Sequence, residues 1–200
     1  KILRTLTIRQ KLLLTIITGT LAVIFLTSAI ALYEMSGILK KDLINKGTIV
    51  ATDVSKHSIE PIMHDDIWEL YKFVRTMTKS SHMPFLNYIM ILDPDGRVLA
   101  HTNPHAYRVG DPVLDSPLDK NALLATDTIV QSVPLSRDEN LYDISVPCYL
   151  ENQKLGIVRV GLTDRFMKKD LAVIKQNILS LALFLSIISI AVGIFMAHRI

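Results

Sequence analysis

Two long uncharged, apolar runs limit what this chain can fold into more than any other feature of its sequence. Residues 12–32 and residues 178–197 contain no Asp, Glu, Lys, Arg or His. As an α-helix, each run is long enough to cross about 30 Å of hydrocarbon, which takes roughly 20 residues. Hydrophobic residues make up 50% of the chain although 20% of its residues are charged. The sequence therefore predicts two transmembrane helices with one domain between them.

Two other interpretations of the apolar runs stay open. The first run follows a basic leader, and Ala29-Ile30-Ala31 has the small-x-small form of a signal-peptidase site. However, the run is longer than the roughly 7 to 15 apolar residues usual in a signal peptide, which favours a retained anchor. The second alternative is a buried helical hairpin of a soluble protein. Few soluble cores absorb two uncharged helices of bilayer length.

The distribution of positive charge predicts how the chain crosses the membrane. Residues 1–11 contain four Lys or Arg residues, whereas Lys40 and Lys41 lie at a similar distance after the first run. The more basic flank tends to be cytoplasmic, so we expect a two-pass protein of the inner (plasma) membrane. The chain begins without Met, so we also expect it to be a piece of a longer protein. The expected segments are a cytoplasmic N-terminus (1–11), transmembrane helix 1 (12–32), an extracytoplasmic domain (33–176), transmembrane helix 2 (177–197) and the start of a cytoplasmic linker (198–200).

After the first run, the pattern of residues 33–58 predicts a helix that continues from the membrane. Its narrow apolar stripe consists of Leu39, Leu43, Val50 and Val54. A stripe of this width is compatible with a seam against a second copy of the chain. Pro61 is expected to bend or end this helix, and Asp65 or Asp66 to cap a second one.

The pattern then becomes strand-like. The expected strands are residues 86–92, 97–101, 128–133, 142–149 and 155–161. A turn at residues 93–96 (Asp-Pro-Asp-Gly) joins the first two, because Pro fixes φ and Gly accepts a positive φ. We expect a loop over residues 102–117, a short helix near 118–125, and a last helix capped by Asp164 that runs into the second span. Helices followed by hairpin-connected strands predict an α+β domain with an antiparallel sheet.

Several classes of function are disfavoured. The net charge of +3 is too small and scattered to indicate nucleic-acid binding, and the single cysteine, Cys148, excludes an internal disulfide. The sequence has no glycine-rich phosphate loop, nucleophile elbow or paired cysteines, so we expect no catalytic site in this fragment. The histidine spacings fit no metal-ligand template, so neither a metal nor a cofactor is expected. Spans without ionisable residues argue against a transporter or channel subunit.

Three segments, residues 88–104, 142–149 and 155–162, resemble the strand-turn-strand, "aPvy" and "GvvrvGl" motifs of single-Cache, PAS-like extracytoplasmic sensor domains. Such domains occur in bacterial sensor histidine kinases and chemoreceptors. The resemblance implies a long N-terminal helix, a five-stranded antiparallel PAS-like sheet, a small-molecule pocket on one sheet face, and a homodimer. Residues 194–200 resemble the start of a HAMP linker.

The resemblance also implies where a ligand binds. In the related citrate and C4-dicarboxylate sensor kinases, two arginines and a histidine hold the ligand's carboxylates. The resemblance places His101 at the position of that histidine. Asp143 occupies the position of one arginine. Val98, with Arg97 next to it, occupies the position of the other arginine. A carboxylate in place of a guanidinium loses a bidentate contact and adds repulsion. We therefore expect a cationic, zwitterionic or neutral ligand rather than a dicarboxylate.

The candidate ligand-binding residues are Tyr88, Arg97, His101, Asp143, Ser145 and Tyr149. Asp143, Ser145 and Tyr149 share one strand face by the two-residue period. The alternatives are a solvent-facing charge at Asp143, a structural hydrogen bond at His101, and a pH response through the histidines.

Taken together, these features favour the input module of a two-component sensor histidine kinase, which senses a small molecule outside the cytoplasm and signals across the membrane. The alternatives are the input module of a chemoreceptor or diguanylate cyclase, and a ligand-free membrane-anchored assembly domain.

Overall fold

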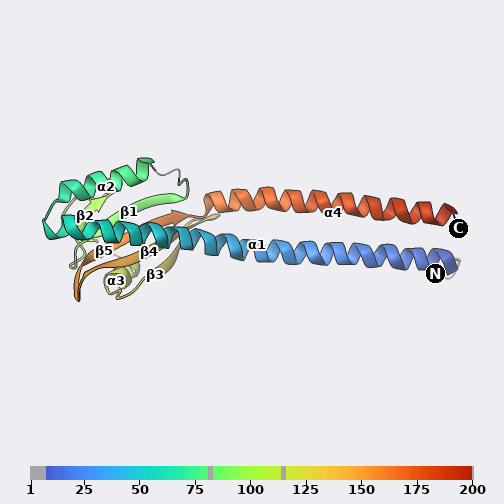
Figure 1. Ribbon diagram of the computed structural model, residues 1–200, viewed down its shortest axis with the longest axis horizontal. Coiled ribbons are helices and arrows are strands. Elements are labelled where there is room, and N and C mark those ends of the chain that lie inside the picture. The colour runs from blue at the N-terminus through green and yellow to red at the C-terminus, as the bar shows by residue number, and fades with distance from the viewer. Residues whose placement is uncertain (1–7, 81–82, 114–115, 200) are drawn as a thin grey trace. The chain divides into compact units, whose positions relative to one another are not determined.

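The computed structural model describes residues 8–80, 83–113 and 116–199. They fall into two compact units, one of Leu39–Lys168 and one from the described parts of Lys1–Ile38 and Lys169–Ile200. The helices are α1 (Ile8–Met63), α2 (Ile67–Ser80), α3 (Pro117–Leu123) and α4 (Arg165–Arg199). The strands are β1 (Leu86–Leu92), β2 (Val98–His101), β3 (Ile129–Ser136), β4 (Glu139–Leu150) and β5 (Gln153–Thr163) (Figure 1).

The five strands form one antiparallel sheet in the order β2-β1-β5-β4-β3, which confirms the predicted α+β fold with a long N-terminal helix. At the β1–β2 turn, the Asp93 carboxylate accepts hydrogen bonds from the backbone N–H groups of Asp95 and Arg97, and Gly96 has a φ of 81°. Strand β3 extends three residues beyond the predicted end and includes Pro134. A proline is tolerated there because β3 is an edge strand.

One face of the sheet packs against α1 and α2. Leu43, Val50 and Val54 of α1 are buried in this core with alternate residues of β1, β4 and β5. The predicted seam against a second copy is therefore wrong for these three residues, because the sheet of the same chain covers them. Gly47 allows the close approach, since a Cβ atom there would collide with Leu162 and Ile144.

The other face carries a smaller apolar cluster at one end, made of Met90, Leu92, Val98 and Val113. Towards β4, the same face carries polar side chains, and α3 approaches it through a contact between Asp119 and Arg159. The sheet therefore separates an apolar helical layer from a mixed surface formed by α3 and the β2–α3 loop.

The helix ends follow the predicted capping residues only in part. Asp66 caps α2, because its carboxylate accepts a hydrogen bond from the N–H of Glu69 at 2.9 Å. Helix α1 continues two residues past Pro61. Asp164 directly precedes α4, but its carboxylate accepts hydrogen bonds from the backbone and side-chain N–H groups of Asn140, both at 2.9 Å.

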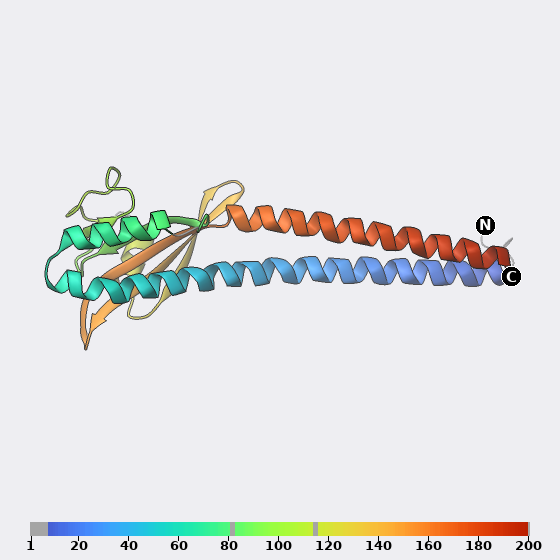
Figure 2. The same ribbon diagram turned by 45° about the horizontal axis from the view of Figure 1, so that its top comes forward.

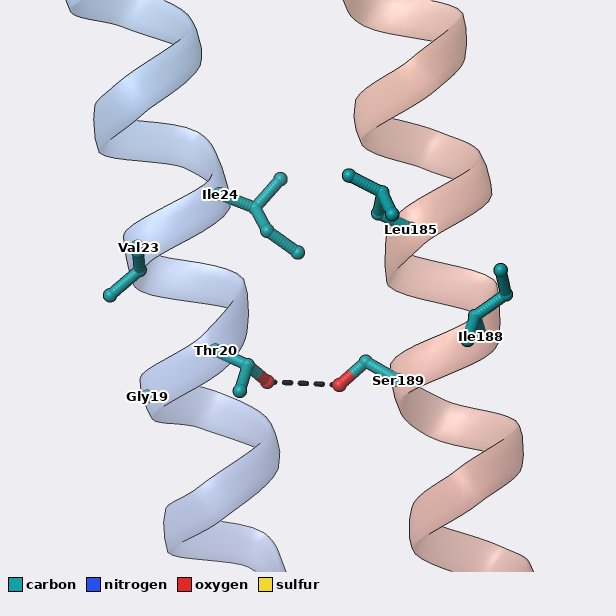
Figure 3. A pocket seen from close by; sticks show the side chains of 7 residues that line it. All are labelled: Gly19, Thr20, Val23, Ile24, Leu185, Ile188 and Ser189. Carbon is teal, nitrogen blue, oxygen red and sulfur yellow. Dashed lines mark hydrogen bonds between the residues drawn. The ribbon is translucent and has the colours of Figure 1, made fainter.

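The second unit consists of the N-terminal part of α1 and most of α4, which run antiparallel within it (Figure 2). Both helices contain segments long and apolar enough to cross a membrane. Thr20 and Ser189 form a hydrogen bond of 2.9 Å between them (Figure 3). Gly193 lies against Ile17, at a position where a Cβ atom would be only 2.6 Å from the Ile17 side chain. Residues 1–7 and 200, at which cytoplasmic ends are expected, lie outside the described residues.

We predict that Gly156→Ala destabilises the sheet. A Cβ atom at this position would collide with the backbone carbonyl of Leu92, which cannot move without the strand. Overpacking of this kind costs about 1–3 kcal/mol, so thermal unfolding of the detergent-solubilised chain should occur at a lower temperature. Gly37→Ala is the matched control, because a Cβ there meets no atom of the described residues within 4 Å. Equal melting temperatures for the two variants would contradict the prediction.

Candidate functional site

The register of the sheet places side chains from four strands in one row. Met90 of β1 pairs with His101 of β2 on one side and with Arg159 of β5 on the other. Arg159 in turn pairs with Ser145 of β4. Paired residues on adjacent strands point to the same face. His101, Arg159 and Ser145 therefore belong to the face opposite α1 and α2.

A second row lies next to the first. Tyr88 of β1 pairs with Gly161 of β5, which pairs with Asp143 of β4. The Tyr88 ring occupies the space over Gly161, because a Cβ atom at that position would collide with the ring. The absence of a side chain at Gly161 thus lets the Tyr88 ring lie across β5 towards Asp143.

Arg159 is the centre of this face. Its Nε donates a hydrogen bond to Asp143 Oδ2 at 3.0 Å, and its Nη2 donates to the same oxygen. Its Nη1 donates to Asp119 Oδ1 at 2.5 Å. The side chain of Arg159 is only 5% exposed. Burial opposes its charge, but the hydrogen bonds and the charge of Asp143 outweigh burial and raise the pKa of Arg159.

Asp119 connects this arginine to α3. The Asp119 Oδ2 atom accepts hydrogen bonds from the N–H (3.0 Å) and hydroxyl (2.7 Å) of Ser116, and the Ser116 Oγ accepts from the N–H of Asp119, forming a capping box. Burial alone would raise the pKa of Asp119, but the bonds from Ser116 and Arg159 lower it below its usual value. Asp119 is therefore ionised at neutral pH.

The other end of α3 is also held by β5. Lys154 Nζ donates hydrogen bonds to the backbone carbonyls of Leu123 (2.7 Å) and Ala125 (2.8 Å). These carbonyls lie at the last residue of α3 and two residues beyond it, where the helix dipole favours a positive charge. One strand thus contacts both ends of the helix through charged side chains.

A cavity of about 490 Å³ opens beside Arg159. It is lined by Asn87, Tyr88, Met90, His101, Thr102, Asn103, Ala106, Tyr107, Val113, Asp119, Leu135, Leu141 and Arg159. The His101 ring stacks on Tyr88, with ring centroids 5.8 Å apart, and contacts Tyr107 at 4.5 Å. The wall of the cavity therefore combines aromatic rings with the charged side chains of Arg159 and Asp119.

His101 and Tyr88 are uncharged at neutral pH. Burial lowers the pKa of His101, whose Nδ1 lies 2.8 Å from the backbone nitrogen and 3.0 Å from the carbonyl oxygen of Asn103. Burial, followed by the negative charge of Asp143, raises the pKa of Tyr88.

Comparison with known proteins assigns the fold to a family. The model of the single Cache domain 3 family matches residues 37–175. The chain belongs to this family. No curated protein sequence gives a significant match.

Two solved structures share the fold of this Cache domain. The sensor domain of the histidine kinase DctB from V. cholerae has a TM-score of 0.54 at 12% identity, covering 68% of this chain and 55% of that one. A domain of a protein assigned to the sensory box/GGDEF family, from Vibrio parahaemolyticus, has a TM-score of 0.51 at 14% identity, covering 74% of this chain and 64% of that one. The chain thus spans less than two thirds of either protein. At these identities the comparison shows the fold alone.

The Cache domain brings four of the six candidate residues together. Tyr88 and His101 line the cavity, while Asp143 and Ser145 are buried on the same face of the sheet. Asp143 Oδ1 and Ser145 Oγ have no hydrogen-bond partner among the described residues. Arg97 and Tyr149 are not among the lining residues.

Arg97 and Tyr149 occupy other parts of the domain. Arg97 Nη1 donates to the carbonyl of Gly110 at 3.3 Å, outside the cavity. Tyr149 lies near the end of β4, where β5 has an extra residue, Leu155, opposite the step from Cys148 to Tyr149, and it is exposed.

The sequence-based reasoning missed Arg159 and Asp119. Arg159 is the only charged residue in the otherwise apolar segment of residues 155–162. A charge in a run that reads as a buried strand needs a partner, and this signal indicates the arginine. Asp119 had no comparable signal, because its pairing with Arg159 depends on how α3 packs.

We predict that Arg159→Met strongly destabilises the Cache domain. The substitution leaves Asp143, whose side chain is 2% exposed, without its counter-charge. Breaking a buried pair in this way costs about 3–5 kcal/mol, which corresponds to a fall in melting temperature of roughly 6–20 °C. Thermal unfolding in detergent, followed by near-ultraviolet circular dichroism, measures the change.

The matched control is Lys46→Met, which breaks the exposed ion pair between Lys46 and Asp42. Exposed pairs contribute about 0–1 kcal/mol. A loss at Arg159 no greater than that at Lys46 would show that the buried pair does not stabilise the domain.

Proposed function

We propose that this chain is the input module of a membrane-bound sensor histidine kinase, whose Cache domain binds a small molecule outside the cytoplasm. The cavity beside Arg159 carries this proposal. Small-molecule sites are typically concave, measure about 300–1,000 Å³ and combine apolar walls with a few convergent polar groups. The cavity of about 490 Å³ has these properties. The shared fold of the DctB sensor domain supports the assignment to a histidine kinase.

The charge of the site favours a ligand that is cationic, zwitterionic or neutral. Two carboxylates, Asp119 and Asp143, surround the single guanidinium of Arg159, and His101 is uncharged. The net charge of this group is therefore −1, and a dicarboxylate would be repelled. The aromatic rings of Tyr88 and Tyr107 provide faces that attract a cation.

The apolar segments support a two-pass arrangement in the inner membrane. Large side chains such as Phe25 (77% exposed) and Leu183 (66% exposed) are not covered by protein. An apolar surface of this extent indicates contact with lipid. We propose that residues 12–32 and 177–197 cross the bilayer, that residues 33–176 lie outside the cytoplasm, and that both ends of the chain are cytoplasmic.

Strand β5 is the proposed path for the signal. It ends at Thr163, and α4 begins at Arg165. A ligand changes the receptor only if it binds two arrangements with different affinity, and such coupling is typically about 1–3 kcal/mol. The receptor is further proposed to act as a homodimer. Because the sheet covers Leu43, Val50 and Val54, an exposed part of α1, such as the face that carries Ile49, is the proposed contact.

A reporter fused after Pro104 tests the topology. We expect alkaline phosphatase at this position to be active and green fluorescent protein to be dark, because the loop after β2 lies outside the cytoplasm in the proposed arrangement. Fusions after Arg9 serve as the opposite control and should show the reverse pattern. A fluorescent, phosphatase-negative fusion at Pro104 would exclude an extracytoplasmic Cache domain.

Thermal unfolding with a panel of metabolites tests ligand binding. We expect at least one amine, zwitterion or neutral polar compound to stabilise the detergent-solubilised chain, and dicarboxylates at equal ionic strength to have no effect. A ligand at 100 times its Kd contributes about 2.7 kcal/mol, which raises the melting temperature by roughly 5–10 °C.

Two variants locate the site of any stabilising compound. Tyr107→Ala removes a ring that lines the cavity and should reduce the shift, whereas Tyr149→Ala lies outside the lining and should leave it unchanged. Stabilisation by dicarboxylates, or equal effects of the two variants, would contradict the proposed site.

A further inference from the structure

The two carboxylates that pair with Arg159 are not equivalent. Asp143 lies on β4, which has a neighbouring strand on each side. It accepts the hydrogen bonds from Nε and Nη2 of Arg159 and is not among the residues that line the cavity. Asp119 lies on α3, accepts the hydrogen bond from Arg159 Nη1, and lines the cavity. A solute in the cavity therefore approaches Arg159 on the side that Asp119 occupies.

We propose that Asp119 is a specificity-determining residue: its carboxylate occupies the position on Arg159 that the carboxylate of a ligand would otherwise take. The inference rests on the proposed function only in that it concerns the same cavity. In this arrangement the Asp119 carboxylate of the domain competes with anionic ligands for Arg159. The selectivity of the cavity against anions then depends on one side chain rather than on the absence of an arginine.

Asp119 is held too firmly for a simple anion to displace it. Its two oxygens accept hydrogen bonds from Arg159 (2.5 Å) and from the N–H (3.0 Å) and hydroxyl (2.7 Å) of Ser116. Hydrogen bonds to a charged acceptor are stronger than those between neutral groups. A carboxylate tethered beside its partner also has a high effective concentration, which a free anion in solution has to exceed.

The position of α3 keeps this competitor in place. Lys154 binds carbonyls at the far end of the helix, at 2.7 and 2.8 Å. Displacing Asp119 would require α3 to move against these bonds or the capping box to open. The side chain is only 13% exposed, so the carboxylate is largely shielded from solvent in this position.

Removing the competitor tests the inference directly. Asp119→Ala deletes the carboxylate and leaves space beside Arg159 Nη1. Acetate is the probe, because it supplies a carboxylate and is only one carbon larger than the deleted group. We expect Asp119→Ala to melt at a lower temperature than the wild-type chain in detergent. Acetate, exchanged for chloride at constant ionic strength, should then raise that temperature by about 3 °C at ten times its Kd.

Three controls separate the proposed role from others. Acetate should not stabilise the wild-type chain, and the neutral isostere acetamide should not stabilise Asp119→Ala. Ser116→Ala removes a capping partner but keeps the carboxylate beside Arg159, so it should not respond to acetate. Asp138→Ala removes an exposed carboxylate elsewhere and should behave as the wild type.

The absence of an acetate-dependent shift in Asp119→Ala would overturn the inference. An equal shift in the wild-type chain or in Ser116→Ala would overturn it as well. If Asp119→Ala does not fold, Asp119→Ser is the second variant, because its shorter side chain also leaves space beside Arg159 and still supplies a capping oxygen. The metabolite panel is independent of these results. If no compound in it stabilises the chain, the proposed function is contradicted, but the role of Asp119 is not decided.

Discussion

The structure of the Cache domain depends on one buried charge. Arg159 is 4% exposed in the middle of the sheet, and a guanidinium in such a place has to be paired. Asp143 of the adjacent strand supplies one partner, and Asp119 supplies the other. Asp119 also closes the capping box of α3, so the arginine and the start of this helix are placed by the same carboxylate. The geometry of the cavity follows from this pairing.

The two-residue period of β5 explains how one strand serves both the core and the site. Val158, Val160 and Leu162 point into the core against α1 and α2. The intervening residues, including Arg159 and Gly161, belong to the opposite face. Because the two sets alternate, the core can remain apolar while the other face carries charge. Neither set can change register without exposing the core and burying additional polar groups.

The fold was predictable from the sequence to a larger extent than the site. Apolar periodicity and the turn at residues 93–96 predict the strands, because both signals are local. The pairing of Arg159 with Asp119 is not local, since the two residues lie 40 positions apart and meet only when α3 packs on the sheet. The apolar stripe of α1 shows the same limit: periodicity identifies its buried side, but the covering surface depends on tertiary packing. Tyr149 shows the same limit, because the two-residue period of β4 does not tell how far along the strand the cavity extends.

The strands that hold the charged group also reach the start of α4. Asp143 lies on β4 and Arg159 on β5, and the start of β4 is bonded to the end of β5 through Asn140 and Asp164. In the proposed receptor, a ligand that alters the pairing of Arg159 therefore acts on the two strands that position the first turn of α4. Binding strength alone does not produce a signal, because only a difference in affinity between two arrangements shifts their populations. In the proposed receptor the two arrangements would differ in how α3 packs beside Arg159, because Asp119 leaves the guanidinium only if the helix moves or its capping box opens.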